Sequence, residues 1–244
     1  MVVYAYAVVR GLDDAELSTI RGVGGTAVRC IGDQELAAVV SSVSTEEFGE
    51  EGLRANLERL EWLEPVARAH HGVVEAVLAR ATTLPLRLAT VYHSDARVVE
   101  VLRSDRSRLQ TALDRLSGRV EIGVKIYLAQ ASGLPRSTVD SGREYLRHRR
   151  DALRSRDTMW AAAATAARAV DAELTALAAD RRHHRPQSGG LVLNAAYLVD
   201  DDVVADFRTR VACLARDARP VLIEATGPWP AYSFATADPT EVSA

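Results

Sequence analysis

The chain has 244 residues, of which 48% are hydrophobic and 26% charged, and its formal net charge is -3. These values are ordinary for a globular protein and give no general attraction to nucleic acid or anionic membranes. The first residues lack the pattern of a secretory signal, and no apolar run approaches the ~20 residues of a membrane span. We therefore expect a cytoplasmic protein with no nucleic-acid or membrane partner, in which Cys30 and Cys213 are buried free thiols.

The N-terminal part of the chain predicts a small antiparallel sheet. Three short apolar and β-branched runs cover residues 2–9, 26–31 and 36–43, and polar or glycine-rich turns separate them. The glycine-rich turn at residues 22–25 lacks the lysine of a phosphate-binding loop, so we interpret it as a connection.

Two helical regions follow the sheet. An apolar stripe at three- and four-residue spacing runs from Leu57 to Leu78, and Pro65 predicts a break in that helix. An extended apolar segment at residues 84–92 comes next. A second helix is expected over residues 95–117, with Ser94 as its N-cap and a glycine directly after its end.

The second half of the chain predicts strands at residues 119–129, 191–199 and 220–226 and helices at 141–182 and 200–217. The long helix has an apolar position every seven residues, and its second seam position is apolar only in the C-terminal part. Such a seam indicates a coiled-coil-like arm or a helix packed along another. The repeating position holds Leu146, Leu153, Trp160, Ala167 and Leu174, and the second position holds Arg149, Arg156, Ala163, Val170 and Leu177.

These elements together predict an α+β protein of two domains. Residues 1–118 form an N-terminal α+β domain with a short sheet and helices. Residues 119–244 form a modified ferredoxin-like sandwich that contains the long helix 141–182 and an aromatic tail. The domain with which the helices of residues 53–117 pack is left open.

The aromatic tail follows the last strand, in the segment from Gly227 to Phe234. Its two prolines restrict the backbone, so Trp229, Tyr232 and Phe234 are presented on a stiff segment. One interpretation is a lid that folds back over the sheet, and another is a preformed contact for a partner, since tryptophan and tyrosine anchor interfaces. The two interpretations are compatible.

The sequence contains no recognisable catalytic motif. The pair His70-His71 is the best candidate for a metal site by composition, but adjacent helical residues point ~100° apart. A core histidine with a hydrogen-bond partner is therefore favoured for His70, which falls on the apolar stripe. Arg87 lies between leucines in an expected strand, where an ion pair with Glu61 or Glu64 is favoured over a substrate clamp. We expect no metal and no cofactor.

Two basic segments border the long helix. Residues 183–185, His-His-Arg, are expected to lie at its C-terminal end, where cations interact favourably with the helix dipole. The segment Arg143–Arg150 opens the helix. It is interpreted as a solvated face, with an electrostatic contact to a partner as the alternative.

Several blocks of sequence, in order, resemble the gas vesicle accessory proteins GvpF and GvpL. The resemblance begins with Gly227–Phe234, which is similar to a Gly-Pro-Trp-Pro-Pro-Tyr-Ser-Phe signature except at Ala231. In the block that begins at Leu84, the family usually has Phe-Gly-Thr where this chain has Leu88-Ala89-Thr90. The further blocks are Tyr4–Val9, Leu60–Leu63, Ala67–His70, Val73–Ala76, Leu84–Arg87, Gly123–Lys125 and Ser141–Leu146 with Arg149-Arg150.

The resemblance implies a non-enzymatic accessory protein of gas vesicle formation that is associated with the vesicle in the cytoplasm. It implies binding to the small, very hydrophobic shell protein GvpA and to other accessory proteins, with no small-molecule substrate. Two alternatives remain: a small-molecule-binding regulatory module built of paired ferredoxin-like domains, and an enzyme centred on Arg87, Glu61 and His70. We expect the shell-binding surface to include the tail residues Trp229, Tyr232 and Phe234 and the seam residues Trp160, Val170 and Leu177.

Overall fold

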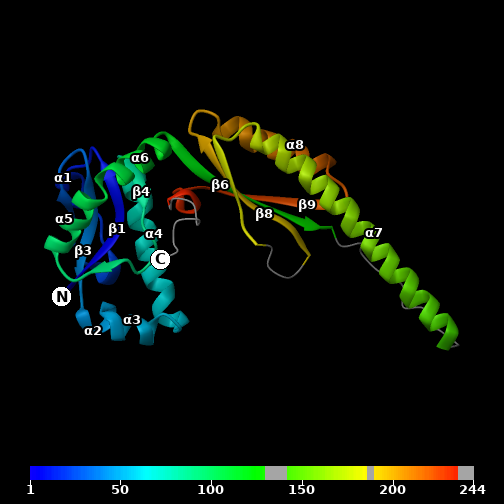
Figure 1. The fold of residues 1–244 in the computed structure, drawn as a ribbon, viewed down its shortest axis with the longest axis horizontal. Helices are drawn as coiled ribbons and strands as arrows, with labels where there is room; N and C mark the ends of the chain where they lie inside the picture. Colours follow the sequence, from blue (N-terminus) through cyan, green and yellow to red (C-terminus); the bar gives the residue numbers. More distant parts are fainter. Residues whose placement is uncertain (130–141, 186–189, 236–244) are drawn as a thin grey trace. The chain divides into compact units, whose positions relative to one another are not determined.

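The structure is a computed structural model that describes residues 1–129, 142–185 and 190–235, without the side chains of residues 142–148, 151 and 152. It combines helices with two β-sheets, and its contacts divide the chain into two compact units (Figure 1). Unit 1 contains residues 1–120 and the segment from Trp229, and unit 2 contains residues 121–228. No helix in the described ranges is both long and apolar enough to span a membrane.

The helices and strands of the described residues differ widely in length. The first part of the chain forms β1 (Val2–Arg10), α1 (Asp14–Leu17), β2 (Val28–Gly32), β3 (Ala37–Val43), α2 (Thr45–Phe48), α3 (Glu50–Asn56), α4 (Leu60–Leu78), β4 (Thr82–Pro85), β5 (Val91–Tyr92), α5 (Asp95–Ser104) and α6 (Arg106–Leu116). The second part forms β6 (Arg119–Leu128), α7 (Gly142–Thr175), β7 (Asp180–His183), β8 (Leu191–Asp200), α8 (Val204–Asp217) and β9 (Val221–Trp229), and single 3-10 turns lie at Val23–Gly25 and Tyr232–Phe234.

The sheet of unit 1 has the order β2-β3-β1-β4, and β5 also pairs with β1. All of these pairs are antiparallel, which confirms the sheet predicted for the N-terminal part. The β1–β3 register shifts between Ala5 and Ala7, as in a β-bulge. Because of this shift, the inward side chains of β1 change from the even positions Val2, Tyr4 and Tyr6 to Ala7 and Val9.

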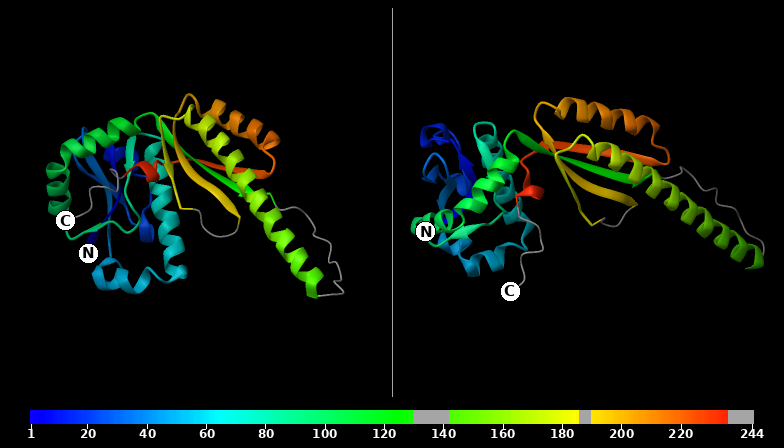
Figure 2. Two further views of the ribbon diagram at one scale, coloured as in Figure 1. Left: turned by 45° about the vertical axis from the view of Figure 1, so that its right-hand side comes forward. Right: turned by 45° about the horizontal axis from the view of Figure 1, so that its top comes forward.

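Helices lie on both faces of this sheet. Figure 2 shows α4 on one side and α5 with α6 on the other. The α4 side is filled by the aromatic residues of β1 and by valines of the helix, and it forms one continuous core. The residues that α4 contributes to this core are Val66, Val73, Val74 and Val77.

Two helix predictions for unit 1 need correction. Pro65 does not break α4, which runs from Leu60 to Leu78 with the proline inside. Pro65 is the sixth residue of α4, beyond the first amide groups that have no helical acceptor, so the helix continues through it with one intrahelical hydrogen bond missing in its second turn. The helix expected at 95–117 is divided at Asp105, whose backbone leaves the helical region. The predicted cap is confirmed, because the Ser94 side chain accepts from the Arg97 amide.

The sheet of unit 2 has the order β7-β8-β6-β9, and α7 and α8 cover one of its faces (Figure 1). The buried face of β6 alternates as predicted, with Ile122, Val124 and Ile126 pointing into the core. Gly123 is needed on the opposite face, where an added Cβ would lie 2.8 Å from the Thr226 hydroxyl. The other core residues are Ala163, Ala167, Val170, Leu174, Ala195, Tyr197, Val199, Phe207, Val211, Val221 and Ile223.

The long helix ends earlier than predicted. α7 stops at Thr175, and the segment expected to complete it turns and forms β7, which pairs antiparallel with β8. The predicted start at residue 141 lies outside the described residues. At the end of the chain, β9 continues through Gly227 and Pro228 to Trp229. β9 is an edge strand, and an edge position tolerates a residue without an amide donor.

Candidate functional site

The centre of unit 1 is a group of four rings in tilted and edge-to-face contact, which we call the Tyr–His cluster: Tyr4, Tyr6, His70 and Tyr232. β1 places both of its tyrosines on the face that α4 covers, and α4 contributes the histidine. The ring centroids of Tyr4 and Tyr6 lie 4.9 Å apart, and those of Tyr4 and His70 lie 5.7 Å apart. Tyr232 closes the group at 6.2 Å from His70. Segments far apart in sequence therefore meet around one buried imidazole.

A chain of hydrogen bonds runs through this cluster and ends on the backbone. The Ala89 amide donates to the Tyr4 hydroxyl over 3.0 Å, and that hydroxyl lies 3.1 Å from His70 Nδ1. His70 Nε2 lies 3.2 Å from the Leu86 carbonyl. The neutral Nε2–H tautomer satisfies every group: Tyr4 donates to Nδ1, and Nε2–H donates to Leu86. These hydrogen bonds hold residues 86–89 against the sheet.

Burial decides the protonation state of the cluster. His70 is only 3% exposed, and its burial lowers its pKa to about 4. Burial also raises the pKa of both Tyr4 and Tyr6. All three groups are therefore neutral near pH 7. The prediction of a core histidine with a hydrogen-bond partner is confirmed, and the described residues contain no group of three or more potential metal ligands.

The described part of the aromatic tail, from Trp229, belongs to unit 1. Trp229 lies 5.4 Å from the His71 ring, and Tyr232 lies 6.2 Å from it. Phe234 is 2% exposed, whereas Trp229 is 39% exposed. The assignment of the tail to the C-terminal domain differs from the grouping of contacts, which places the segment from Trp229 in unit 1, where Tyr232 packs against the core.

The three seam residues proposed for partner binding have different environments in unit 2. Trp160 is half-buried, and Val170 is buried in the core between α7 and the sheet. Leu177 lies beyond the end of α7 and is 38% exposed. The C-terminal half of the seam is thus an intramolecular contact, and Val170 is not accessible to a partner.

The ion pair expected between Arg87 and Glu61 is absent from the described residues. Arg87 lies in the loop after β4, not in a strand, and both side chains are exposed. Glu64, the other candidate, pairs with Arg68 one turn further along α4. The correction follows from the local backbone, because the loop turns after Pro85 instead of continuing the strand.

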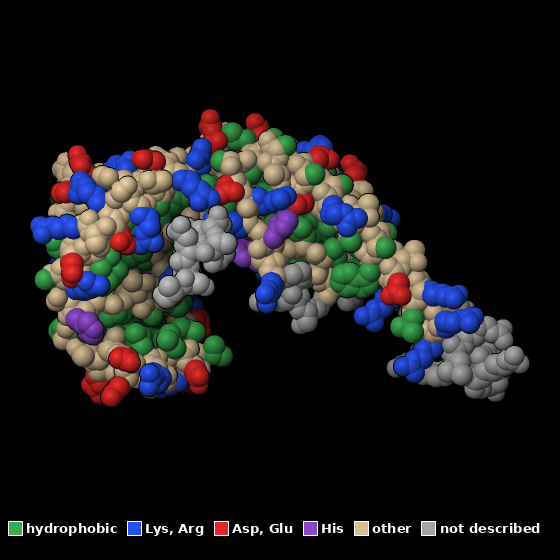
Figure 3. All heavy atoms as spheres, viewed as in Figure 1, with side chains coloured by type: hydrophobic (Ala, Val, Ile, Leu, Met, Phe, Trp, Pro, Cys, Tyr) green, Lys and Arg blue, Asp and Glu red, His purple; other side chains and the backbone are tan. Residues whose placement is uncertain are grey.

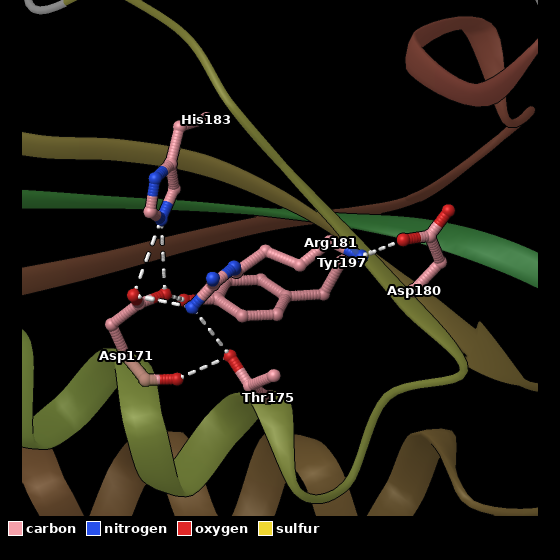
Figure 4. Close-up of polar contacts among 6 residues, drawn as sticks. All are labelled: Asp171, Thr175, Asp180, Arg181, His183 and Tyr197. Carbon is pink, nitrogen blue, oxygen red and sulfur yellow. Dashed lines mark hydrogen bonds and ion pairs between the residues drawn. The ribbon is translucent and has the colours of Figure 1, made fainter. Parts of the chain in front are cut away.

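Unit 2 contains a buried carboxylate that sequence reasoning missed, and we call its surroundings the Asp171 centre. Asp171 is 8% exposed and accepts a hydrogen bond from the Tyr197 hydroxyl over 2.7 Å (Figure 4). Arg181 Nη1 lies 2.6 Å from the same carboxylate, and His183 Nε2 lies 3.2 Å from it. Burial, and then the hydrogen bond to Asp171, raise the pKa of Tyr197. Three donors from β7 and β8 thus converge on one helix residue.

The interpretation of His183 as a cation at the end of a helix is corrected, because His183 lies in β7 and contacts Asp171. The Asp171 centre attaches the short strand β7 to α7. One signal for this centre was present in the sequence: the acidic residue Asp171 directly follows Val170, which is a residue of the apolar seam. An acidic residue at such a position requires partners when it is buried.

One flank of α4 leaves apolar groups uncovered. We define the α4 flank as Leu60, Leu63, Ala67 and Trp229. The three helix residues follow one another at three- and four-residue spacing toward His71, and the Trp229 ring contacts the His71 ring. Leu60 is 78% exposed, and Leu63 and Ala67 are half-buried. Figure 3 shows hydrophobic side chains exposed over the α3–α4 part of unit 1.

The whole chain is similar to known gas vesicle proteins. Residues 2–236 match the family model described as gas vesicle synthesis protein GvpL/GvpF. Gas vesicle protein L of Streptomyces sp. (strain CB03234) is 40% identical over 246 residues, which cover 95% of this chain and 92% of that protein. Gas vesicle protein F2 of Halobacterium salinarum is 25% identical over 95% of this chain and 90% of its own length.

Solved structures share the fold. The crystal structure of GvpF from Microcystis aeruginosa matches with a TM-score of 0.72 and 18% identity, over 97% of this chain and 99% of that one. GvpF from Anabaena sp. PCC7120 matches with a TM-score of 0.69 and 19% identity, over 97% of both chains. Together, the fold and the nearly full-length sequence match show that this chain belongs to the GvpL/GvpF family of gas vesicle synthesis proteins.

Proposed function

We propose that this protein is a non-enzymatic accessory factor that binds the small hydrophobic shell protein GvpA during gas vesicle assembly in the cytoplasm. The observation that carries the proposal is the family match over residues 2–236. A shell subunit with an apolar face aggregates unless another surface covers that face. Other accessory proteins of the vesicle are the expected further partners.

The α4 flank is the surface that we assign to the shell protein. Trp229 and Leu60 offer exposed apolar area, and an exposed tryptophan on a fixed backbone is a favourable anchor for an interface. Tyr232 and Phe234 act indirectly, because they pack the tail onto unit 1. The segments that carry the family resemblance, including Tyr4 and His70, meet directly beneath this tail in the Tyr–His cluster.

The proposal is tested by co-expression of this chain with GvpA, followed by a pull-down from the soluble fraction. The wild-type chain is expected to recover soluble GvpA. The double variant Leu60→Asp/Trp229→Ala should recover at least about tenfold less, because it removes the anchor and places a charge on the flank. The matched control is Leu222→Asp, which changes a leucine that is 53% exposed on β9.

Two results would count against the proposal. If folded wild-type protein recovers no GvpA, direct shell binding is wrong. If the double variant and the Leu222→Asp control lose GvpA equally, binding is real but the α4 flank is not its site.

We also propose that unit 2 is a modified ferredoxin-like sandwich and that the first part of α7 is a coiled-coil-like arm. The support is the element order β6-α7-β7-β8-α8-β9 together with the strand order β7-β8-β6-β9. The split β-α-β-β-α-β motif has this element order.

The alternative, a small-molecule-binding regulatory module, has no specific support in the surface hollows along α4 and α5. One hollow is lined by Glu64, Pro65, Arg68 and Ala69, and the other by residues of α5 between Ala96 and Ser104. Each is lined by a single helix, whereas a ligand site brings polar groups together from several elements.

A further inference from the structure

The first part of α7 has a surface stripe that the sheet of unit 2 does not cover. Figures 1 and 2 show this part of the helix extending beyond the ends of the strands. The stripe consists of Arg149, Leu153, Arg156 and Trp160, at alternating spacings of four and three residues. The same spacing continues through the buried residues Ala163, Ala167, Val170 and Leu174. One seam therefore has an intramolecular partner over its second half only.

The uncovered half of the seam is accessible. Leu153 is 52% exposed, and Arg149 and Arg156 are exposed. Trp160 is half-buried, where the stripe enters the core of unit 2. A leucine and a tryptophan at heptad spacing on a projecting helix are the knobs that a second helix would pack between.

The charge of this region is positive. Residues 149–157 contain four arginines and two aspartates. Within the described part of the chain, no ion pair joins Arg149 or Arg156 to a carboxylate. Figure 3 shows Lys and Arg side chains gathered along the outer part of α7. The guanidinium groups on the stripe are thus placed for carboxylates of a partner, which they bind in a bidentate manner.

We propose that the stripe Arg149–Leu153–Arg156–Trp160 binds an acidic amphipathic helix of a protein partner in coiled-coil fashion. The partner helix places leucine or alanine against Leu153 and Trp160 and glutamate or aspartate against the two arginines. This contact lies in unit 2, is separate from the α4 flank, and does not depend on shell binding.

Three other occupants fit the stripe less well. A membrane-surface helix keeps its cations on the polar face, whereas Arg149 and Arg156 lie within the apolar stripe itself. A second copy of α7 would bring arginines against arginines. Residues 130–141 of this chain contain a single aspartate and a single arginine, so they offer no excess of negative charge.

The test is the binding of the full chain to a fluorescent peptide of about four heptads, with leucine and glutamate in the facing positions. A control peptide carries lysine in place of glutamate. The acidic peptide is expected to bind in a salt-dependent manner and at least about tenfold more tightly than the basic one. Arg149→Glu/Arg156→Glu and Leu153→Asp should each weaken acidic-peptide binding at least about tenfold.

The single variant Arg156→Glu should also weaken binding of the acidic peptide. Its matched control is Arg154→Glu, the same charge change on another side of α7, which should change binding by less than about twofold. Leu60→Asp, which alters the α4 flank, should leave peptide binding unchanged. The proposal is overturned if the basic peptide binds equally well, or if Arg154→Glu weakens binding as much as Arg156→Glu. It is also overturned if phosphatidylserine vesicles bind through the stripe while the acidic peptide does not.

Discussion

Each of the two units has polar groups in its apolar core, and the two units stabilise these groups in opposite ways. The Tyr–His cluster of unit 1 is electrically neutral, and its hydrogen bonds pass from Ala89 through Tyr4 and His70 to the backbone at Leu86. The Asp171 centre of unit 2 is built around a carboxylate that faces Arg181 and His183. Both use a buried tyrosine hydroxyl, on Tyr4 and on Tyr197, as a neutral connecting donor.

This difference predicts which change destabilises each unit. A neutral network loses stability when one of its members becomes charged, because burial penalises the charge. A charged centre loses stability when the charge is removed, because its buried donor, the Tyr197 hydroxyl, remains without an acceptor. Acid and mutation should therefore affect the two units unequally, and measurements that resolve the units can separate these effects.

The largest expected effect is the loss of the carboxylate at Asp171. Asp171→Ala removes the acceptor of the buried Tyr197 hydroxyl and one of the two acceptors of the Arg181 guanidinium, which keeps Thr175, and it should lower the free energy of unfolding of unit 2 by about 3 kcal/mol. Hydrogen exchange of the β8 amides in urea measures this value for unit 2 alone. Asp157→Ala, at an exposed site on the same helix, is the control and should cost less than about 0.5 kcal/mol. A cost at Asp171 below about 1 kcal/mol would show that the centre is not important for stability.

The second effect is the acid sensitivity of unit 1. The pKa of His70 is about 4 in the folded protein, below its ordinary value of about 6.5. The folded state thus binds fewer protons than the unfolded state between these values. The stabilisation is complete above about pH 6.5 and is lost progressively as the pH falls to about 4, by about 3 kcal/mol in total.

Urea unfolding of unit 1 at a series of pH values, followed by hydrogen exchange at β1, measures this slope. His70→Gln removes the titrating group and should flatten the profile between pH 6.5 and 4. His93→Gln, at an exposed histidine, should leave the slope unchanged. An unchanged slope in His70→Gln would assign the acid sensitivity to other groups.

The third effect concerns the space around the second tyrosine of the cluster. A Cβ on Gly22 would lie 2.2 Å from the Tyr6 hydroxyl, which accepts from the Val23 amide over 2.8 Å and contacts Ser41 over 2.7 Å. Gly22→Ala should therefore destabilise unit 1 by about 2 kcal/mol through overpacking. Gly72→Ala on α4 meets no neighbour within 4 Å and should instead stabilise the unit by up to about 1 kcal/mol. Equal effects at the two glycines would contradict the packing explanation.

The sequence predicted what local patterns determine, and it missed what distant contacts determine. The alternation in β6, the Ser94 cap and the buried position of His70 on α4 follow from neighbouring residues. The segment after Thr175 is rich in alanine, which favours a helix, yet β7 forms because it pairs with β8.

The same limit explains the errors at the candidate site. His183 was interpreted from its position after a helix, whereas its partner Asp171 lies twelve residues away in sequence and becomes a neighbour only when β7 folds back. The tail directly follows β9 in sequence, but the core against which Tyr232 packs belongs to unit 1. Pairing partners of this kind have no periodic signal in a single sequence.

The smallest effect tests whether the loop held by the Tyr–His cluster is strained. Ala89 has φ +62°, a left-handed conformation that costs an L-residue roughly 1–2 kcal/mol, and its amide donates to Tyr4. In the family pattern that the sequence resembles, glycine stands at this position. Ala89→Gly relieves the steric cost but adds roughly 0.5–1 kcal/mol of chain entropy in the unfolded state, so unit 1 should gain about 0.5 kcal/mol.

Urea unfolding followed at β1 compares this variant with Ala96→Gly in α5, where the backbone is helical and the same substitution should cost about 0.5–1 kcal/mol. If glycine stabilises the protein at position 89 and destabilises it at position 96, the Tyr4 hydrogen bond holds a backbone conformation that alanine adopts only under strain. Equal losses would mean that Ala89 is relaxed in its conformation. The neutral cluster of unit 1 would then fix the loop without storing strain there, and the contrast with the charged centre of unit 2 would rest on the pH slope alone.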